Sequence, residues 1–172
     1  GGEPGPRQRL LDANRLAEAF FTEQLATPQA QAARDFLTGR GFDRLAAAHF
    51  AVGYAPAGWD NLARRLRDAG YTEHELVESG LCSRSSGARV YDRFRDRLIW
   101  PIRDVTGATV GFGARRLSEA DQGPKYLNTP ETPVYHKGQV LYGLDLAKKE
   151  IARSHQVVIV EGYTDVMAAH LS

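Results

Sequence analysis

The chain has 172 residues, of which 42% are hydrophobic and 25% charged, with a net charge of +1 and one cysteine. These values are ordinary for a globular protein with a buried core, and no apolar run approaches the ~20 residues that span a bilayer. A single cysteine, Cys82, excludes an internal disulfide and any multi-cysteine zinc site, and it favours a reducing compartment. We expect Cys82 to be a small buried side chain.

The first 80 residues predict helices, after a short linker at residues 1–7. Apolar residues recur every three or four positions from Leu10 to Leu25, which indicates one long amphipathic helix. Thr27-Pro28 caps the next helix, and Thr72 and Glu75 form a capping box for the last one. The expected elements are helices at 10–25, 28–40, 60–69 and 72–80, with a short strand at 50–55.

After Gly80 the hydrophobic pattern changes to a period of two, which is typical of strands. Glycine-containing turns at 85–88 and 105–108 predict two hairpin connections. Residues 98–102 and 108–112 are then expected to pair as strands. Pro101 predicts that its strand lies at a sheet edge or a bulge, because proline lacks the amide hydrogen that a ladder needs.

The C-terminal part predicts a loop at 123–143, a helix at 144–153 and a buried strand at 157–160. That strand ends on Glu161, and in open α/β sheets ligands bind beyond the carboxyl ends of the strands. Asp165 follows four residues later and could face the same crevice. Oxygen ligands of this kind suit Mg²⁺, although two carboxylates are too few for a two-metal site. The alternative is that both residues only cap the following helix.

The middle of the chain is basic. Between Arg84 and Lys137 there are ten Lys and Arg residues against six Asp and Glu residues, a balance that favours phosphate-rich partners. Arg93, Arg95 and Arg97 alternate along the sequence, so an extended segment would place them on one face. Guanidinium groups bind phosphates through paired hydrogen bonds.

A second basic segment mixes lysine, asparagine and aromatic residues over 124–131 and 135–138. Aromatic rings stack on nucleobases while lysines meet phosphates, so the mixture is typical of single-stranded nucleic-acid binding. The alternative is a proline-braced surface loop in which Tyr126 and Tyr135 are half buried.

Taken together and in order, these motifs resemble the bacterial DnaG-type replicative primases. The resemblance covers essentially the whole chain after the linker, and it rests on the segments Phe50–Asp60, Tyr91–Arg97, Pro101–Asp104, Gly111–Arg115, Pro124–Asn128, His136–Gly138, Leu141–Gly143 and Val160–Asp165.

The resemblance implies an α+β fold. A primase catalytic-core N-terminal subdomain, with helices followed by antiparallel hairpins, is expected at residues 8–153. The first strand and helix of a toprim α/β subdomain are expected at 154–172. The family's remaining acidic metal ligands would lie beyond Ser172, its helicase-binding domain would follow them, and its zinc-binding domain would precede Gly1. The chain alone is therefore expected to bind nucleic acid without polymerising.

The resemblance also implies an activity, DNA-templated synthesis of short RNA primers in the bacterial cytoplasm. The expected partners are a single-stranded DNA template, an RNA–DNA hybrid, ribonucleoside triphosphates and a replicative helicase, with no membrane. Mg²⁺ or Mn²⁺ would serve catalysis. Glu161 would act as general acid/base or metal ligand beside Asp165, and a basic cleft would contain Arg93, Arg95, Arg115, Lys125, Asn128 and Lys137.

Two other functions remain open at this point. One is a non-enzymatic module that binds single-stranded nucleic acid. The other is a different toprim enzyme, such as a topoisomerase or nuclease, although the upstream arginine and lysine motifs are not expected in those enzymes.

Overall fold

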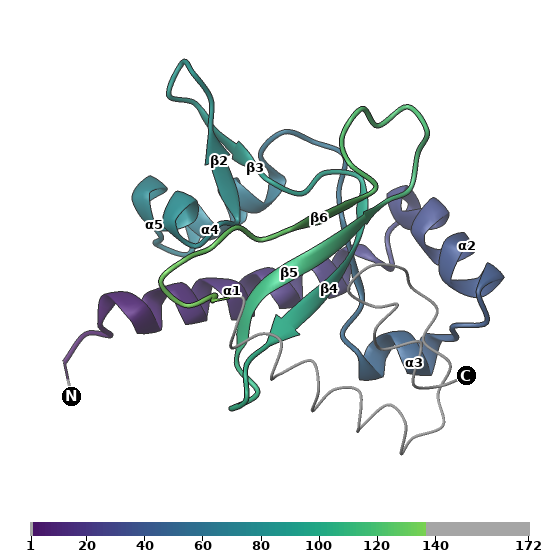
Figure 1. Ribbon diagram of the computed structural model, residues 1–172, viewed down its shortest axis with the longest axis horizontal. Helices are drawn as coiled ribbons and strands as arrows, with labels where there is room; N and C mark the ends of the chain where they lie inside the picture. Colours follow the sequence, from purple (N-terminus) through teal and green to yellow (C-terminus); the bar gives the residue numbers. More distant parts are fainter. Residues whose placement is uncertain (1, 137–172) are drawn as a thin grey trace.

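The computed structural model of the protein describes residues 2–136 (Figure 1). The helix and strand expected at 144–153 and 157–160 lie outside these residues. The described elements are α1 (Pro6–Gln24), η1 (Pro28–Ala30), α2 (Gln31–Gly39), α3 (Arg44–His49), β1 (Gly53–Ala55), α4 (Asn61–Asp68), α5 (Glu73–Glu78), β2 (Cys82–Arg84), β3 (Val90–Asp92), β4 (Arg97–Arg103), β5 (Thr109–Arg116) and β6 (Tyr126–Asn128). In this part of the chain no helix has the length and apolar character needed to cross a membrane.

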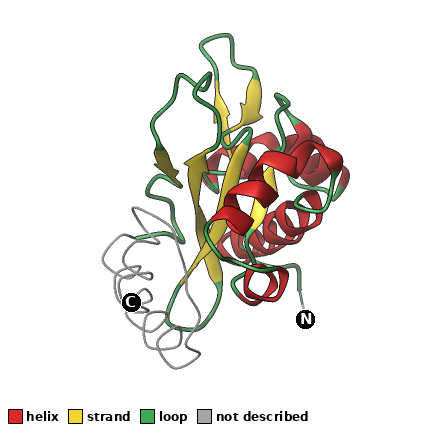
Figure 2. Ribbon diagram, turned by 90° about the vertical axis from the view of Figure 1, so that its right-hand side faces the viewer, coloured by secondary structure: helices red, strands yellow, loops and turns green. Residues whose placement is uncertain are grey.

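The centre of the fold is a four-stranded antiparallel sheet in the order β1-β4-β5-β6. A separate hairpin pairs β2 with β3 and projects from the sheet (Figures 1 and 2). Both predicted hairpin turns are present, and the turn before β5 has Gly107 at φ +87°. The helices and the antiparallel strands together give the expected α+β fold.

Pro101 lies on an inner strand, yet its surroundings agree with the prediction of an edge or a bulge. Pairing of β1 with β4 ends at Ile99, so Pro101 has a ladder partner only on β5. A register shift follows between Ile102 and Arg103. Pro101 therefore lies where β4 has a partner strand on one side only, and there the missing amide hydrogen can be tolerated.

Successive residues of β1 and β4 are divided between two hydrophobic clusters, because neighbouring side chains of a strand point to opposite faces. Ala55 and Ile99 pack with the apolar face of α1, including Phe20 and Phe21. Tyr54 and Leu98 pack instead with α2 and α3. Figure 1 shows α1 crossing behind β4 and β5, while α2 and α3 lie beside the end of the sheet.

The capping box predicted at Thr72 and Glu75 is present at the start of α5. The Thr72 hydroxyl accepts a hydrogen bond from the Glu75 amide, and the Glu75 carboxylate accepts one from the Thr72 amide. The same carboxylate accepts two hydrogen bonds from Arg9, at 2.6 and 2.8 Å, which join α1 to α5.

Three local features differ from the prediction or were absent from it. The segment 44–49 forms α3, capped by the Asp43 side chain, where the sequence pattern predicts no helix or strand. The expected loop 123–143 contains the short strand β6. Tyr135 is fully buried rather than half buried, while Cys82 is buried as expected.

Candidate nucleic-acid interface

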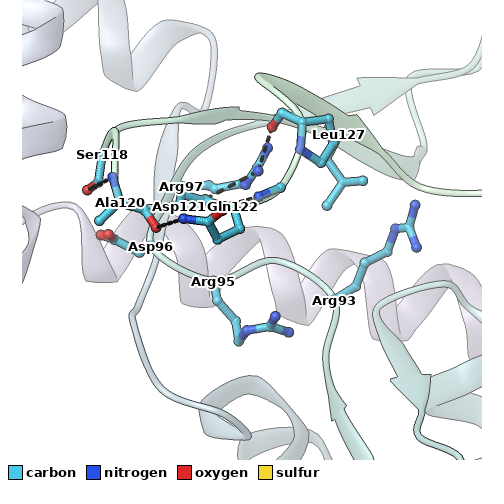
Figure 3. A pocket seen from close by; sticks show the side chains of 11 residues that line it. Arg93, Arg95, Asp96, Arg97, Ser118, Ala120, Asp121, Gln122 and Leu127 are labelled. Atoms are coloured by element: carbon cyan, nitrogen blue, oxygen red, sulfur yellow. Dashed lines mark hydrogen bonds and ion pairs between the residues drawn. The ribbon is translucent and has the colours of Figure 1, made fainter.

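A cleft of about 530 Å³ lies between the turn that precedes β4 and the loop that joins β5 to β6 (Figure 3). The turn, residues 93–96, contributes Arg93 and Arg95, and β4 contributes Arg97. Leu127 of β6 supplies an apolar wall. Three arginines line the cleft against two aspartates, so its charge favours an anionic ligand.

Arg97 holds the loop side of the cleft in place. Its side chain is only 4% exposed, and its Nη2 atom donates to the Pro124 carbonyl at 2.6 Å and lies 3.2 Å from the Asp121 carboxylate. Figure 3 shows this side chain directed at the loop, away from Arg93 and Arg95. The Nη1 atom is buried and has no hydrogen-bond partner among the described residues. We therefore regard Arg97 chiefly as the anchor of the loop.

Arg93 lies at the outer edge of the sheet. Its Nε and Nη2 atoms donate to the backbone carbonyl of Asn128, at 3.0 and 2.8 Å. Burial lowers the pKa of Arg93, but an arginine remains charged at neutral pH. Within the described part of the chain no carboxylate forms an ion pair with it, so its positive charge is available to a ligand.

Arg95 belongs to an aromatic platform, which we define as Trp59, Tyr91 and Arg95. The rings of Trp59 and Tyr91 stack with centroids 4.7 Å apart and planes inclined by 16°. The Arg95 guanidinium carbon lies 4.6 Å from the Trp59 ring centroid and 5.3 Å from that of Tyr91. Trp59 is 43% exposed, so part of the platform faces solvent. Stacked aromatic residues beside a guanidinium are suited to bases and phosphates together.

A second arginine cluster surrounds Phe36 of α2. The guanidinium carbons of Arg40 and Arg115 lie 4.6 and 4.3 Å from its ring centroid. Two like charges held against one ring are stabilised when an anion lies near them. The Nε atom of Arg115 is also buried and lacks a partner among the described residues.

The predicted basic residues are therefore distributed between two places. Arg115 pairs with Leu98 and Tyr126 in the ladder, so these three share a face of the sheet, whereas Leu127 points to the opposite face, toward the cleft. Asn128 shares the face of Tyr126, while its carbonyl contacts Arg93. The Lys125 ammonium lies 5.8 Å from the ring centroid of Tyr126.

The segment that carries Arg93, Arg95 and Arg97 is not extended throughout, so the three side chains do not share one face. Residues 93–96 form a turn in which Asp96 has φ +51°, stabilised by a 2.6 Å hydrogen bond from the Tyr54 hydroxyl to the Asp96 carboxylate. The turn separates the three side chains: one contacts the sheet edge, one the aromatic platform and one the loop. All three residues nevertheless line one cleft.

Lys137, Glu161 and Asp165 lie outside the described residues. Among residues 2–136 there is no group of three His, Cys, Asp or Glu side chains placed to hold a metal ion. The predicted Mg²⁺ site, with Glu161 as its ligand, therefore stays a prediction.

Three residues of the interface were not singled out from the sequence: Arg40, Trp59 and Asp92. Arg40 follows α2 in a segment that carries only a turn signal. Trp59 lies in the motif Phe50–Asp60, which by itself does not indicate a role for this side chain. Asp92 follows two residues of a strand and carries no local signal, because its partners lie about thirty residues away in sequence.

The helices, the antiparallel sheet and the arginine-lined cleft define an α+β domain with a positively charged cleft. The chain belongs to the family of the DNA primase catalytic core, N-terminal domain, whose model matches residues 20–148. The resemblance seen in the sequence motifs is thereby confirmed.

Individual relatives agree with this assignment. The DNA primase of Streptomyces coelicolor is 58% identical over 169 residues, which are 98% of this chain and 26% of that protein. The RNA polymerase domain of Mycobacterium tuberculosis primase DnaG, solved with a double-stranded DNA oligomer carrying a 6-nucleotide overhang, is 49% identical with a TM-score of 0.79 over 95% of this chain and 51% of that one. A DnaG primase catalytic domain bound to single-stranded DNA is 38% identical with a TM-score of 0.77 over 96% of this chain and 53% of that one. The chain thus spans about a quarter of the length of the curated relative.

Proposed function

We propose that this chain is part of a bacterial replicative primase, a DNA-templated RNA polymerase that makes short RNA primers. The observation that carries the proposal is that Arg93 and Arg95 line one cleft, while Arg95 also packs against the stacked rings of Trp59 and Tyr91. Family membership gives this arrangement its meaning, since relatives of the same fold have been solved with DNA.

We assign the single-stranded DNA template to the cleft and the aromatic platform. The Arg95 guanidinium would meet a backbone phosphate while the adjacent indole stacks on a base. The stack restricts the rotamers of Arg95 before DNA arrives, which lowers the conformational entropy lost on binding. Arg93 is bound to the edge of β6 through two of its N–H groups. Its remaining N–H groups and its charge would face the same DNA strand.

We assign the phosphates of the incoming ribonucleoside triphosphate, or of the RNA–DNA hybrid, to the other face of the sheet. Arg40 and Arg115 concentrate positive charge there around Phe36, Asn128 of β6 shares that face, and Lys125 immediately precedes β6. Lys137 would complete the set. Holding several phosphates at once is the main demand of nucleotidyl transfer.

Metal-dependent catalysis belongs to the proposal as well. Glu161 and Asp165 would hold Mg²⁺ or Mn²⁺, whose chemistry is to polarise the attacking hydroxyl and the triphosphate. A zinc-binding domain before this segment, a helicase-binding domain after it and a cytoplasmic location complete the expected whole enzyme.

Fluorescence anisotropy of a labelled oligothymidylate, measured at two salt concentrations, tests the assignment of the template. We expect Trp59→Ala to weaken binding by about tenfold, because stacking on one aromatic residue contributes about 1–3 kcal/mol per base. Arg93→Ala and Arg95→Ala should each weaken binding and reduce the slope of log K against log salt by about one.

Arg15→Ala is the matched control, since it removes an exposed arginine of α1 that is paired with Asp12 and lines no part of the cleft. If the Arg15 and Arg95 variants lose affinity equally, binding reflects net charge alone and the assignment of the template path is wrong. If the wild-type protein binds no DNA at either salt concentration, the proposed function of this segment fails.

A further inference from the structure

Asp92, the last residue of β3, is linked to all three members of the aromatic platform. Two links are backbone hydrogen bonds, and the third is the peptide bond to its neighbour Tyr91. Its backbone amide donates to the Trp59 carbonyl at 2.8 Å. Its backbone carbonyl accepts a 2.6 Å hydrogen bond from Arg95 Nη1. Tyr91 precedes it in the strand. Asp92 therefore connects the segment before α4, which contains Trp59, with the segment after β3, which contains Arg95.

The Asp92 side chain performs a second task, because it caps α4. Its two carboxylate oxygens each accept a hydrogen bond, from the amides of Leu62 and Ala63, both at 2.9 Å. Asp60 occupies the N-cap position but makes no capping hydrogen bond with its side chain. A capping carboxylate normally comes from the N-cap residue itself, whereas here it comes from a strand twenty-nine and thirty residues away.

This remote cap fixes the position of Trp59. The first turn of α4 begins two residues after Trp59, so the two carboxylate bonds fix the chain shortly after the indole, and the bond to the Trp59 carbonyl fixes the backbone of Trp59 itself. The carboxylate is buried, and the titratable groups that face it include Asp60 before α4, the neutral Cys82 thiol on β2 and the Arg95 guanidinium. Buried hydrogen bonds of this kind impose a single geometry, because breaking one leaves a donor without a partner.

We propose that Asp92 is a positioning residue for template binding: by capping α4 from β3 it holds Trp59, Tyr91 and Arg95 in one stacked arrangement before DNA arrives. The inference rests on the proposed function, since it assumes that the platform contacts the template.

The test compares Asp92→Asn with Thr72→Ala, two variants that each weaken a helix cap. Asparagine has the shape of aspartate but only one acceptor oxygen, so it retains one amide bond and loses the other. Thr72→Ala removes the capping box of α5, whose Thr72 and Glu75 side chains bond to each other and to Arg9 rather than to Trp59, Tyr91 or Arg95. Urea unfolding measures the loss of stability in both variants.

Iodide quenching of tryptophan fluorescence then reports the platform directly. The protein has two tryptophans, and Trp100 is only 4% exposed, so iodide senses Trp59. We expect Asp92→Asn to raise quenching of Trp59 and to weaken oligothymidylate binding about fivefold, while Thr72→Ala changes neither. Equal effects of the two variants on quenching and affinity, at similar losses of stability, would overturn the proposal.

A measurement on the wild-type protein covers the case in which Asp92→Asn does not fold. Amide hydrogen exchange of Leu62, Ala63 and Asp92 should slow when oligothymidylate binds, because stacking on Trp59 stabilises the bonds that hold it. Unchanged exchange at these amides would overturn the proposal. Loss of DNA binding in Trp59→Ala with no effect of Asp92→Asn would retain the proposed function and reject only the positioning role.

Discussion

Individual arginines of this domain do different work even where they are close in sequence. Arg93 and Arg97 are four residues apart, yet one presents its charge at the sheet edge and the other is enclosed by a loop. The degree of burial separates the two roles, because Arg97 is enclosed and bonds to the loop, whereas Arg93 is only partly buried. A partly buried arginine is thus a candidate for binding, whereas an enclosed one is a candidate for stability.

Arg97→Ala is predicted to lower the free energy of unfolding by about 2 to 3 kcal/mol, because it leaves the Pro124 carbonyl and the Asp121 carboxylate without their partner. The loop 117–125 would then lose its anchor, and DNA affinity should fall with it. Urea unfolding followed by circular dichroism measures the change. Arg64→Ala is the control, because Arg64 is paired with Asp60 at 3.4 Å with its side chain 64% exposed, and such pairs contribute about 0–1 kcal/mol. A loss no larger for Arg97 than for Arg64 would contradict the structural role.

At the scale of elements, the contact between α1 and β1 depends on a glycine. A Cβ atom added to Gly53 would lie 2.5 Å from the backbone carbonyl carbon of Phe21. Helix α1 and strand β1 therefore approach each other more closely than any side chain allows, and the backbone of α1 cannot move aside as a flexible side chain would.

Gly53→Ala is accordingly predicted to lower the free energy of unfolding by at least about 2 kcal/mol, since it overpacks a rigid contact. Gly39→Ala offers a matched control at the end of α2, where an added Cβ meets nothing within 4 Å. That change should leave stability unchanged or raise it by up to about 1 kcal/mol, because alanine restricts the unfolded chain. Thermal unfolding of both variants measures the difference, and similar melting temperatures would show that α1 tolerates the displacement.

The elements that were predicted from the sequence are those specified by local signals. The long apolar stripe gave α1, the capping box gave α5, and glycine-containing turns gave both hairpins. Helix α3 was missed because six residues carry too short a period to recognise, and its stability comes from packing of Ala46 and Ala47 in the cluster with α2. The conformation of residues 93–96 could not be predicted from local signals, because Tyr54, whose hydroxyl bonds to Asp96, lies forty-two residues away.

At the scale of the whole molecule, the sequence indicates a basic middle region but not how its residues are grouped in space. Arg93 donates a hydrogen bond to the carbonyl of Asn128, thirty-five residues later, and the Arg115 guanidinium packs over the ring of Phe36 on another element. Such contacts follow from the packing of helices and strands far apart in sequence, which no local pattern encodes. The division of the basic residues between the cleft and the Phe36 cluster is therefore a property of the fold.

Stability of the whole domain should depend on pH through two carboxylates with opposite effects. Burial raises the pKa of Asp92 to about 6 from an ordinary value of 3.8, against the two amide bonds from α4. Between these values the folded protein retains a proton that the unfolded chain releases, so the free energy of unfolding falls as the pH rises. The hydrogen bonds from Arg9 lower the pKa of Glu75 to about 2 from 4.5. Its stabilising contribution is complete above pH 4.5 and is lost as the pH falls toward 2.

Urea unfolding of the wild-type protein across this range should therefore show two slopes of opposite sign, which single substitutions separate. Asp92→Asn is predicted to remove the decline between pH 4 and pH 6, which amounts to about 3 kcal/mol at most for this group. Glu75→Gln should leave that decline intact and flatten the loss of stability below pH 4.5, because glutamine does not titrate. Each variant is the control for the other, since both alter a helix cap but only one contacts the platform. A decline between pH 4 and pH 6 that persists in Asp92→Asn would assign it to another group and show that the buried carboxylate is ionised throughout.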